Sequence, residues 1–196
     1  MFDVGGVLYD WHPRFLFDRM TDDTALVDRL VAEAVTHEWH FQHDAGRDFA
    51  DTSAELIAQF PHYAHFIEAF GPRFNETNRA PIPGTHEILR ELDARGVPLF
   101  AITNFSHEFF PPFAAQHAEI FDRFRKVVVS GTEKLMKPHP EIYRRARARF
   151  GLAPGEGLFI DDRKDNAEAS EPEGFVGYHF TGADSLRTRL EGLGLL

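Results

Sequence analysis

The chain has 196 residues, of which 43% are hydrophobic, so it can bury the core of one large domain. Its net charge of −10, with no dense block of lysine and arginine, argues against nucleic acid as the main partner. No apolar run approaches the ~20 residues of a membrane span, so no membrane is expected as a partner. The lack of cysteine suits a reducing compartment, and we expect a cytoplasmic protein. We expect either a monomer or a homodimer.

The chain opens with a very short apolar stretch, which a long helical region follows. Only Met1 and Phe2 precede the acid Asp3, whereas a buried strand usually runs for about 5–6 residues. We therefore expect either a truncated first strand or a numbering that starts after the natural beginning. A truncated strand would hold Asp3 loosely. Residues 14–80 have a helical character and no convincing strand. Apolar residues recur there at helical spacing over 25–35, 53–60 and 63–70.

From residue 81 onward, helical stretches alternate with short apolar runs. Such alternation predicts a mostly parallel sheet that is covered by helices on both faces. We therefore predict an α/β protein with a discontinuous core, residues 1–13 and 81–196, and an inserted helical cap, residues 14–80. The expected strands are 97–103, 126–130, 157–160 and 175–180, and the expected helices are 85–95, 140–150 and 166–170.

Polar residues follow the expected strands. Asp3, Thr103 and Asp161 each stand at a strand end, and Lys137 lies seven residues beyond Ser130. Because ligands bind beyond the carboxyl ends of the strands in such sheets, we expect these side chains to share one crevice. Crowded carboxylates repel, and Mg²⁺ relieves that repulsion, so Asp3 and Asp161 are the natural metal pair. A carboxylate can also attack phosphorus, while Thr103 and Lys137 can bind the phosphoryl oxygens.

Four segments, in this order, resemble the motifs of the haloacid dehalogenase superfamily. They are Phe2-Asp3-Val4-Gly5-Gly6-Val7-Leu8, Ile102-Thr103-Asn104, Lys137-Pro138-His139-Pro140-Glu141-Ile142-Tyr143 and Phe159-Ile160-Asp161-Asp162. The chain most resembles the subfamily with a helical cap after the first motif and a paired-acid fourth motif. The resemblance implies a Rossmann-like core and a Mg²⁺-dependent phosphoric monoester hydrolase. Such an enzyme would act through an aspartyl-phosphate on small phosphorylated metabolites, sugar phosphates among them.

Position within these motifs implies a role for each residue. The acid of the first motif would be the nucleophile, and the lysine of the third would neutralise charge. Gly5 and Gly6 let the backbone pass close to metal and phosphate, with amide groups facing them. The implied catalytic residues are Asp3 and Lys137, and the implied metal ligands are Asp3, the Gly5 carbonyl and Asp161. The implied phosphate-binding residues are Thr103, Asn104 and Gly6. Asp162 and Asp165 are expected just outside the metal ligands.

The chain departs from the phosphatase pattern two residues after Asp3. Phosphatases of the superfamily usually carry a second aspartate there, which protonates the leaving group and later activates water. This chain has Gly5 instead. Such acid–base help is commonly worth about 10²–10⁴ in rate. We therefore expect a preference for easily expelled leaving groups, as in sugar 1-phosphates and acyl phosphates.

One cap segment carries side chains suited to contact a substrate. Because a lid excludes water and contacts the leaving group, we expect cap residues to choose the substrate. Trp39, His40 and His43 are candidates for lining the pocket, although an interfacial helix with satisfied histidines explains the same pattern. Arg47 could bind an anion or lie at the surface. Residues 105–113 are expected to form a loop near the cap.

Two other interpretations stay open. A 2-haloacid dehalogenase also uses an aspartate nucleophile and lacks the second aspartate. It needs no Mg²⁺, however, and its fourth motif is typically Ser-Asn-like, so Asp161 and Asp162 favour the phosphatase. A catalytically impaired ligand-binding member of the fold is the other alternative, which Gly5 and the short first strand support.

Overall fold

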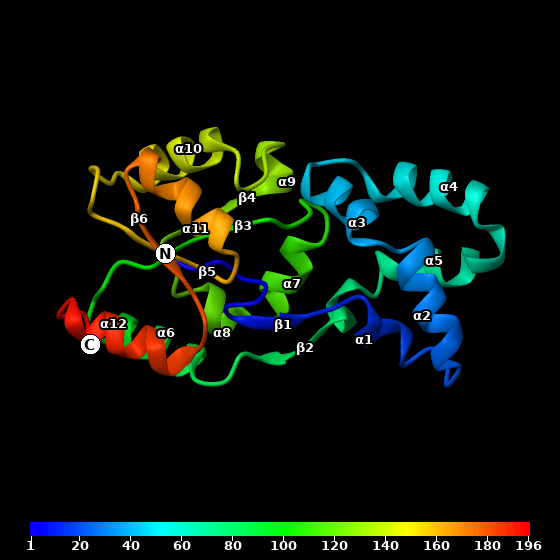
Figure 1. Ribbon diagram of the computed structural model, residues 1–196, viewed down its shortest axis with the longest axis horizontal. Coiled ribbons are helices and arrows are strands. Elements are labelled where there is room, and N and C mark those ends of the chain that lie inside the picture. The colour runs from blue at the N-terminus through cyan, green and yellow to red at the C-terminus, as the bar shows by residue number, and fades with distance from the viewer.

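The computed structural model describes residues 1–196, and its centre is a parallel sheet. Strand β3 (Phe100–Thr103) pairs with β4 (Lys126–Val129), and β5 (Leu158–Asp161) pairs with β6 (Val176–His179). Phe2 forms parallel bridges to both β3 and β5 and so joins the two pairs. The order is therefore β4, β3, the amino-terminal segment, β5 and β6, which confirms the predicted α/β class (Figure 1).

Main-chain hydrogen bonds hold the amino-terminal segment in the sheet on both sides. Phe2 N donates to Phe100 O (3.0 Å), and Phe2 O accepts from Ile102 N (3.1 Å). On the other side, Asp3 N donates to Ile160 O (2.9 Å). The expected first strand is thus reduced to one bridging residue, but the neighbouring strands fix the backbone of Asp3.

Helices cover both faces of this sheet. Helices α6 (Thr85–Ala94) and α12 (Ala183–Gly192) lie on one face, and α10 (Pro140–Phe150) and α11 (Lys164–Ser170) lie on the other (Figure 1). Helix α10 begins at a proline, whose missing N–H has no intrahelical partner to lose, and a glycine with φ of 73° follows its end. These local signals explain why the sequence predicts α10 with the observed bounds.

The side chains of the strands divide between two buried clusters. Because neighbouring strand residues point to opposite faces, Phe100 and Ile102 belong to a cluster of 10 buried residues on the α10 side. Ala101 and Ile160 belong to the larger cluster of 33 buried residues, which extends into α6, α12 and the cap. Burial of one large aliphatic or aromatic side chain stabilises the fold by about 1.5–3 kcal/mol, so both clusters hold the strand ends in place.

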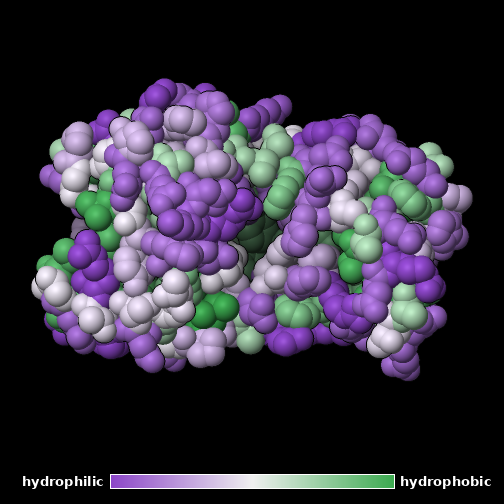
Figure 2. All heavy atoms as spheres, in the orientation of Figure 1, coloured by the Kyte–Doolittle hydropathy of each residue, from purple (hydrophilic) through white to green (hydrophobic).

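The cap is a group of helices beside the sheet (Figure 1). The chain leaves the core through β1 (Tyr9–Trp11) and returns through β2 (Asn78–Pro81), and these two strands pair antiparallel. The side chains of Asp23 and Thr36 accept hydrogen bonds from the first turns of α2 and α3 and so begin these helices. Figure 2 shows a recess between the cap and the core. The cap helices are α1 (Arg14–Phe17), α2 (Thr24–Glu33), α3 (His37–Asp44), α4 (Phe49–Gln59) and α5 (Ala64–Phe70).

Two short strands and one helix differ from the sequence-based expectation. Strands β1 and β2 have three and four residues, too few for a period-two pattern to be recognised. The sequence predicts a loop over 105–113, but α7 (Phe110–Gln116) begins within it, with proline in its first turn. None of the helices is both long and apolar enough to cross a membrane. The remaining elements are α8 (Ala118–Phe121), α9 (Ser130–Glu133) and the 3₁₀ turns Pro61–Tyr63, Phe74–Thr77 and Glu171–Glu173.

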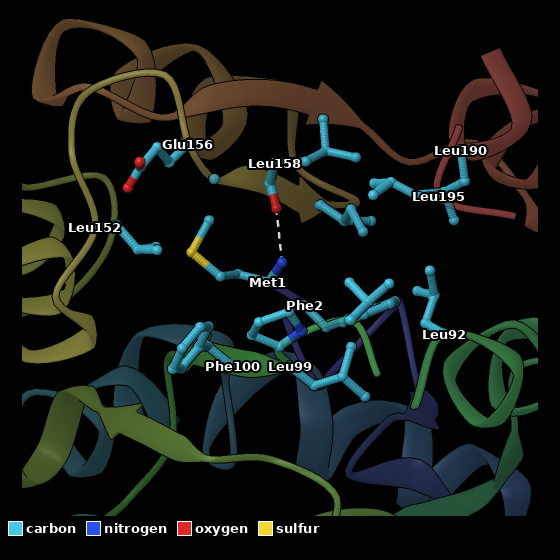
Figure 3. A pocket seen from close by; sticks show the side chains of 14 residues that line it. Met1, Phe2, Leu92, Leu99, Phe100, Leu152, Glu156, Leu158, Leu190 and Leu195 are labelled. Carbon is cyan, nitrogen blue, oxygen red and sulfur yellow. Dashed lines mark hydrogen bonds between the residues drawn. The ribbon is translucent and has the colours of Figure 1, made fainter. Parts of the chain in front are cut away.

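A cavity of about 200 Å³ lies at the amino-terminal end of the sheet, beside Met1 (Figure 3). The ammonium group of Met1 donates to Leu158 O at 2.6 Å, and burial lowers its pKa to about 5. Aliphatic side chains form most of the wall, among them Leu92, Leu99 and Leu190. The cavity lies between the starts of β3 and β5.

Candidate active site

A cavity of about 300 Å³ lies beyond the carboxyl ends of the strands, between core and cap. Ligands bind in this place in open α/β sheets, and Figure 2 shows the molecule hollowed between its two lobes. The core lines the cavity with Asp3, Val4, Gly5, Gly6, Asn104, Phe105, Asp162, Arg163 and Asn166, and the cap with its connections adds Asp10, Trp11, His37, His40, Phe41, Asp44, Phe74 and Asn78.

The ammonium group of Lys137 lies between two buried carboxylates. Its Nζ is 2.8 Å from Asp3 Oδ2 and 2.7 Å from Asp161 Oδ2, and it donates to Ile102 O at 3.0 Å. The side chains of Lys137 and Asp161 are fully buried, whereas that of Asp3 is 11% exposed. The structure thus brings together three residues that the sequence assigns to one crevice, and of these only Asp3 lines the cavity.

Asn104 holds the segment that carries Lys137. Its Oδ1 accepts from Lys137 N (2.8 Å), and its Nδ2 donates to Lys137 O (3.0 Å). The side-chain amide of Asn104 is therefore bound to the main chain, although the residue borders the cavity. Thr103 is fully buried at the end of β3 and is not among the cavity-lining residues. The phosphate-binding roles of Thr103 and Asn104 stay predictions.

Asp161 accepts hydrogen bonds from two residues that are absent from the sequence-based candidates. Its Oδ1 accepts from Arg163 N (2.9 Å) and from Asn166 Nδ2 (3.1 Å). Asn166 lies in the first turn of α11, and its own Oδ1 has no partner. Its place in the helix that directly follows the fourth motif is the signal that could have found it. Asp165 pairs with the guanidinium group of Arg163 (2.8 Å) and does not line the cavity.

Burial changes the protonation of these charged groups. It raises the pKa of Asp3 to about 7, against the attraction of Lys137. For Lys137, burial acts to lower the pKa, but Asp161 and Asp3 outweigh it, so the pKa is raised. The pKa of Asp162 is raised by burial and by the charge of Asp161. The site therefore holds more acidic groups than one ammonium group can balance when they are ionised.

This set of oxygen atoms fits a hard divalent cation. One carboxylate oxygen from each of Asp3, Asp161 and Asp162 lies within 4.8 Å of the others, and such ligands suit Mg²⁺. Asp162, expected just outside the metal ligands, thus lies among the ligand candidates. Gly6 has φ of 71°, and a Cβ there would lie 2.4 Å from Asp162 Oδ2, so the close approach requires glycine. A Cβ on Gly5 would meet no atom within 4 Å.

Only one of the three cap candidates lies at the cavity. His40 lines it and stacks on Trp11, with ring centroids 4.6 Å apart. Trp39 Nε1 donates to Thr52 O (3.2 Å), and His43 Nε2 bonds to Thr52 Oγ1 (2.6 Å), inside the cap. Of the three alternatives, His40 therefore lines the cavity, and Trp39 and His43 do not. The residues of α3 at the cavity recur every three or four positions, and these two lie on another face.

Two acids at the cavity are absent from the sequence-based candidates. Asp44 ends α3 and is 3% exposed, and Asp10 lies in β1 and is partly exposed. The spacing of three and four residues from His37 through His40 to Asp44 is the signal that could have found the cap acid. Arg47 does not line the cavity and pairs with Glu55 at the surface (2.6 Å).

A family model of haloacid dehalogenase-like hydrolases matches residues 1–172, and the chain belongs to this family. Among known proteins, the chain is similar to the sesquiterpene phosphatase astK of Aspergillus oryzae. The two are 29% identical over 194 residues, which cover 97% of this chain and 92% of the relative.

Two solved structures show the same fold. A HAD family enzyme of Bacteroides thetaiotaomicron, in complex with magnesium and inorganic phosphate, matches with a TM-score of 0.67, 19% identity and 92% coverage of both chains. The L-2-haloacid dehalogenase of Xanthobacter autotrophicus, with chloropropionic acid covalently bound, matches with a TM-score of 0.62 and 16% identity, covering 100% of this chain and 82% of that one. At these identities the likeness shows the fold alone, so the chemistry must be argued from the residues.

Replacing Lys137 with methionine should strongly destabilise the protein. The variant would leave Asp3 and Asp161 buried without their cation, and removal of one partner from a buried ion pair costs about 3–5 kcal/mol. Urea unfolding at neutral pH measures this loss. The matched control is Lys164→Met, which removes an exposed lysine paired with Glu168 and should cost less than about 1 kcal/mol. Similar losses in both variants would contradict the importance of the buried contact.

Proposed function

We propose that the protein is a Mg²⁺-dependent phosphatase that forms an aspartyl-phosphate on Asp3. The observation that carries this proposal is the contact of Lys137 with both Asp3 and Asp161 at the wall of the cavity. The ammonium group favours the ionised, nucleophilic form of Asp3, and the cavity gives a substrate access to that carboxylate. Membership of the hydrolase family and similarity to a phosphatase support the same chemistry.

The metal site of this proposal consists of oxygen ligands. Asp3, Asp161 and Asp162 would hold Mg²⁺, together with the backbone carbonyl of Gly5. Bound there, Mg²⁺ would offset the charge of the carboxylates and of the substrate phosphate. The positive charge of a metal ion is needed because the acidic groups of the site outnumber its one buried lysine.

The residues of the chain supply the covalent chemistry. A carboxylate oxygen of Asp3 would attack phosphorus while the bond from phosphorus to the leaving-group oxygen breaks. Lys137 would stabilise the charge that collects at the reaction centre. The loop through Gly5 and Gly6, together with Asn104 directly after β3, would border the phosphoryl group. Water would then attack phosphorus, which releases phosphate and restores Asp3.

The cavity favours a small phosphorylated molecule as substrate. Its volume of about 300 Å³ suits a compact metabolite such as a sugar phosphate. Trp11, Phe41 and Phe74 give the cap side of the cavity an aromatic wall, which suits a ring or an apolar leaving group. Because one relative is named a sesquiterpene phosphatase, apolar phosphate esters belong in the same substrate screen.

A 2-haloacid dehalogenase is the second candidate function. Gly5 favours it, because dehalogenases also lack the second aspartate, and one solved neighbour is a haloacid dehalogenase. The grouping of Asp162 with Asp3 and Asp161 argues against it, because a reaction without metal would leave these acids unbalanced. The residues therefore support phosphoryl transfer better than dehalogenation.

A panel of phosphorylated metabolites, assayed for phosphate release with and without Mg²⁺, tests the proposal. We expect Mg²⁺-dependent turnover, and a fall of about 10⁴-fold or more in Asp3→Asn, because the amide is a poor nucleophile. Asp184→Asn, which changes an exposed acid of α12, should keep the activity. Metal-dependent turnover that survives in Asp3→Asn would contradict the mechanism. Halide release from 2-haloacids without metal would establish the second candidate.

Mg²⁺ should also stabilise the folded protein, as any ligand of the folded state does. At 100 times its Kd, Mg²⁺ should add about 2.7 kcal/mol and raise Tm by several degrees in calorimetry. Asp161→Asn should lose most of this increment, whereas Asp184→Asn should keep it. An undiminished increment in Asp161→Asn would place the metal elsewhere.

A further inference from the structure

Asp44 is a buried acid at the cavity, and the phosphoryl transfer through Asp3 described above does not use its carboxyl group. Asp44 ends α3, is 3% exposed and lines the same cavity as Asp3. Its Oδ1 has no hydrogen-bond partner, and His40 Nε2 lies 3.6 Å away. No lysine or arginine forms an ion pair with it. Since burial of an unpaired polar group costs free energy, this carboxyl group requires an explanation.

The core fixes the position of this end of the cap helix. Ser130 Oγ donates to Asp44 O (2.6 Å) and accepts from Phe105 N (3.0 Å). A Cβ on Gly131 would lie 3.1 Å from His43 O, so the glycine permits a close approach of α9 to α3. Figure 1 shows these two helices side by side. The cap acid is therefore tied to the loops that follow β3 and β4, next to the site of Asp3.

The surroundings of Asp44 favour its protonated form. Burial and, to a smaller extent, the charge of Asp3 raise the pKa of Asp44 to about 8, while Lys137 opposes the rise. Burial lowers the pKa of His40 to about 3, so the neighbouring imidazole is neutral. A carboxyl group that is protonated near neutral pH can donate a proton to a leaving group. The other titratable groups that line the cavity are Asp10 from β1, His37 from α3, and Asp162 and Arg163 from the core.

We propose that Asp44 is the general acid and general base of the reaction and replaces the aspartate that is missing at Gly5. The proposal rests on the phosphatase function proposed above. In the first step Asp3 bonds to phosphorus, the bond to the leaving group breaks, and the leaving oxygen takes the proton of Asp44. In the second step water attacks phosphorus and gives a proton to the Asp44 carboxylate, while the bond from phosphorus to Asp3 breaks. The cycle restores both carboxyl groups.

The position of Asp44 on the cap suits this role. The cap covers the side of the cavity that the leaving group would occupy, because a phosphoryl group bonded to Asp3 would lie against the core. The core loop offers no such group, since Gly5 has no side chain and the space next to it is open. Asp10 also lines the cavity and is therefore the competing candidate. Unlike Asp44, it is partly exposed.

This proposal changes the leaving-group preference that Gly5 predicts. With a cap acid in place, turnover should depend only weakly on the pKa of the leaving group. The preference for easily expelled leaving groups, such as those of sugar 1-phosphates and acyl phosphates, should become strong only when the acid is removed.

The plot of turnover against leaving-group pKa in Asp44→Asn tests the proposal, because asparagine keeps the size but cannot exchange the proton. We expect kcat for alkyl phosphates to fall about 10²–10⁴-fold, and kcat for p-nitrophenyl phosphate to fall less than about tenfold, so the slope steepens. The matched control Glu38→Gln, an exposed acid on the same helix, should leave the slope unchanged. Asp10→Asn tests the competing candidate.

A second arm uses the open space at Gly5. In the Asp44→Asn background, Gly5→Asp should restore turnover of alkyl phosphates, because it places a carboxyl group at the position where most phosphatases carry it. If Asp44→Asn does not fold, Asp44→Glu replaces it, and its altered reach should give an intermediate slope.

An equal fall for all esters in Asp44→Asn, an unchanged slope in Asp44→Glu, or a slope that steepens only in Asp10→Asn would overturn the proposal. Failure of the proposed function would give a different result, because the unmodified protein itself would then release no phosphate with Mg²⁺.

Discussion

The ammonium group of Lys137 between Asp3 and Asp161 is the contact on which the rest of the site depends. Two carboxylates buried so close together repel each other unless a cation lies between them. The contact brings together Asp3, Lys137 and Asp161, which lie far apart in the chain. The order of the sheet makes this possible, because the amino-terminal segment that carries Asp3 runs between β3 and β5. Apolar replacement of buried ion pairs is often neutral or stabilising, so the chemistry of the site explains these charges better than stability does.

The cap and the core contribute different parts of the site. In the proposed reaction the core supplies the groups that handle charge at phosphorus, namely Asp3, Lys137 and the acids around them. The cap supplies an aromatic wall and the buried acid Asp44. Because Ser130 ties the end of α3 to the core, the two parts meet in a fixed relation. Under the proposed role of Asp44, this division lets the core loop carry Gly5 while a proton donor on the cap serves the leaving group.

Much of the core could be predicted from sequence, because each strand is a short apolar run that ends in polar residues such as Asp161. The groups around these residues could not be found in the same way. The position of Asp44 depends on a contact between segments that lie far apart in the chain, the hydrogen bond from Ser130. Asn166 lies close to Asp161 in the chain, but the contact between their side chains depends on the shape of the turn that joins β5 to α11. On α3, the sequence could not decide between His40 and Trp39, because a rotation of one position around the helix determines which side chain faces the cavity.

The central claim is that Asp3 carries the phosphoryl group during turnover. The most direct test is acid-quenched mass spectrometry of the protein during steady turnover of a phosphorylated metabolite with Mg²⁺. We expect a phosphoryl group on the peptide that contains Asp3, because acid preserves an acyl phosphate long enough for detection. Steady release of phosphate with no phosphoryl group on that peptide, or with the group on another residue, would contradict the account.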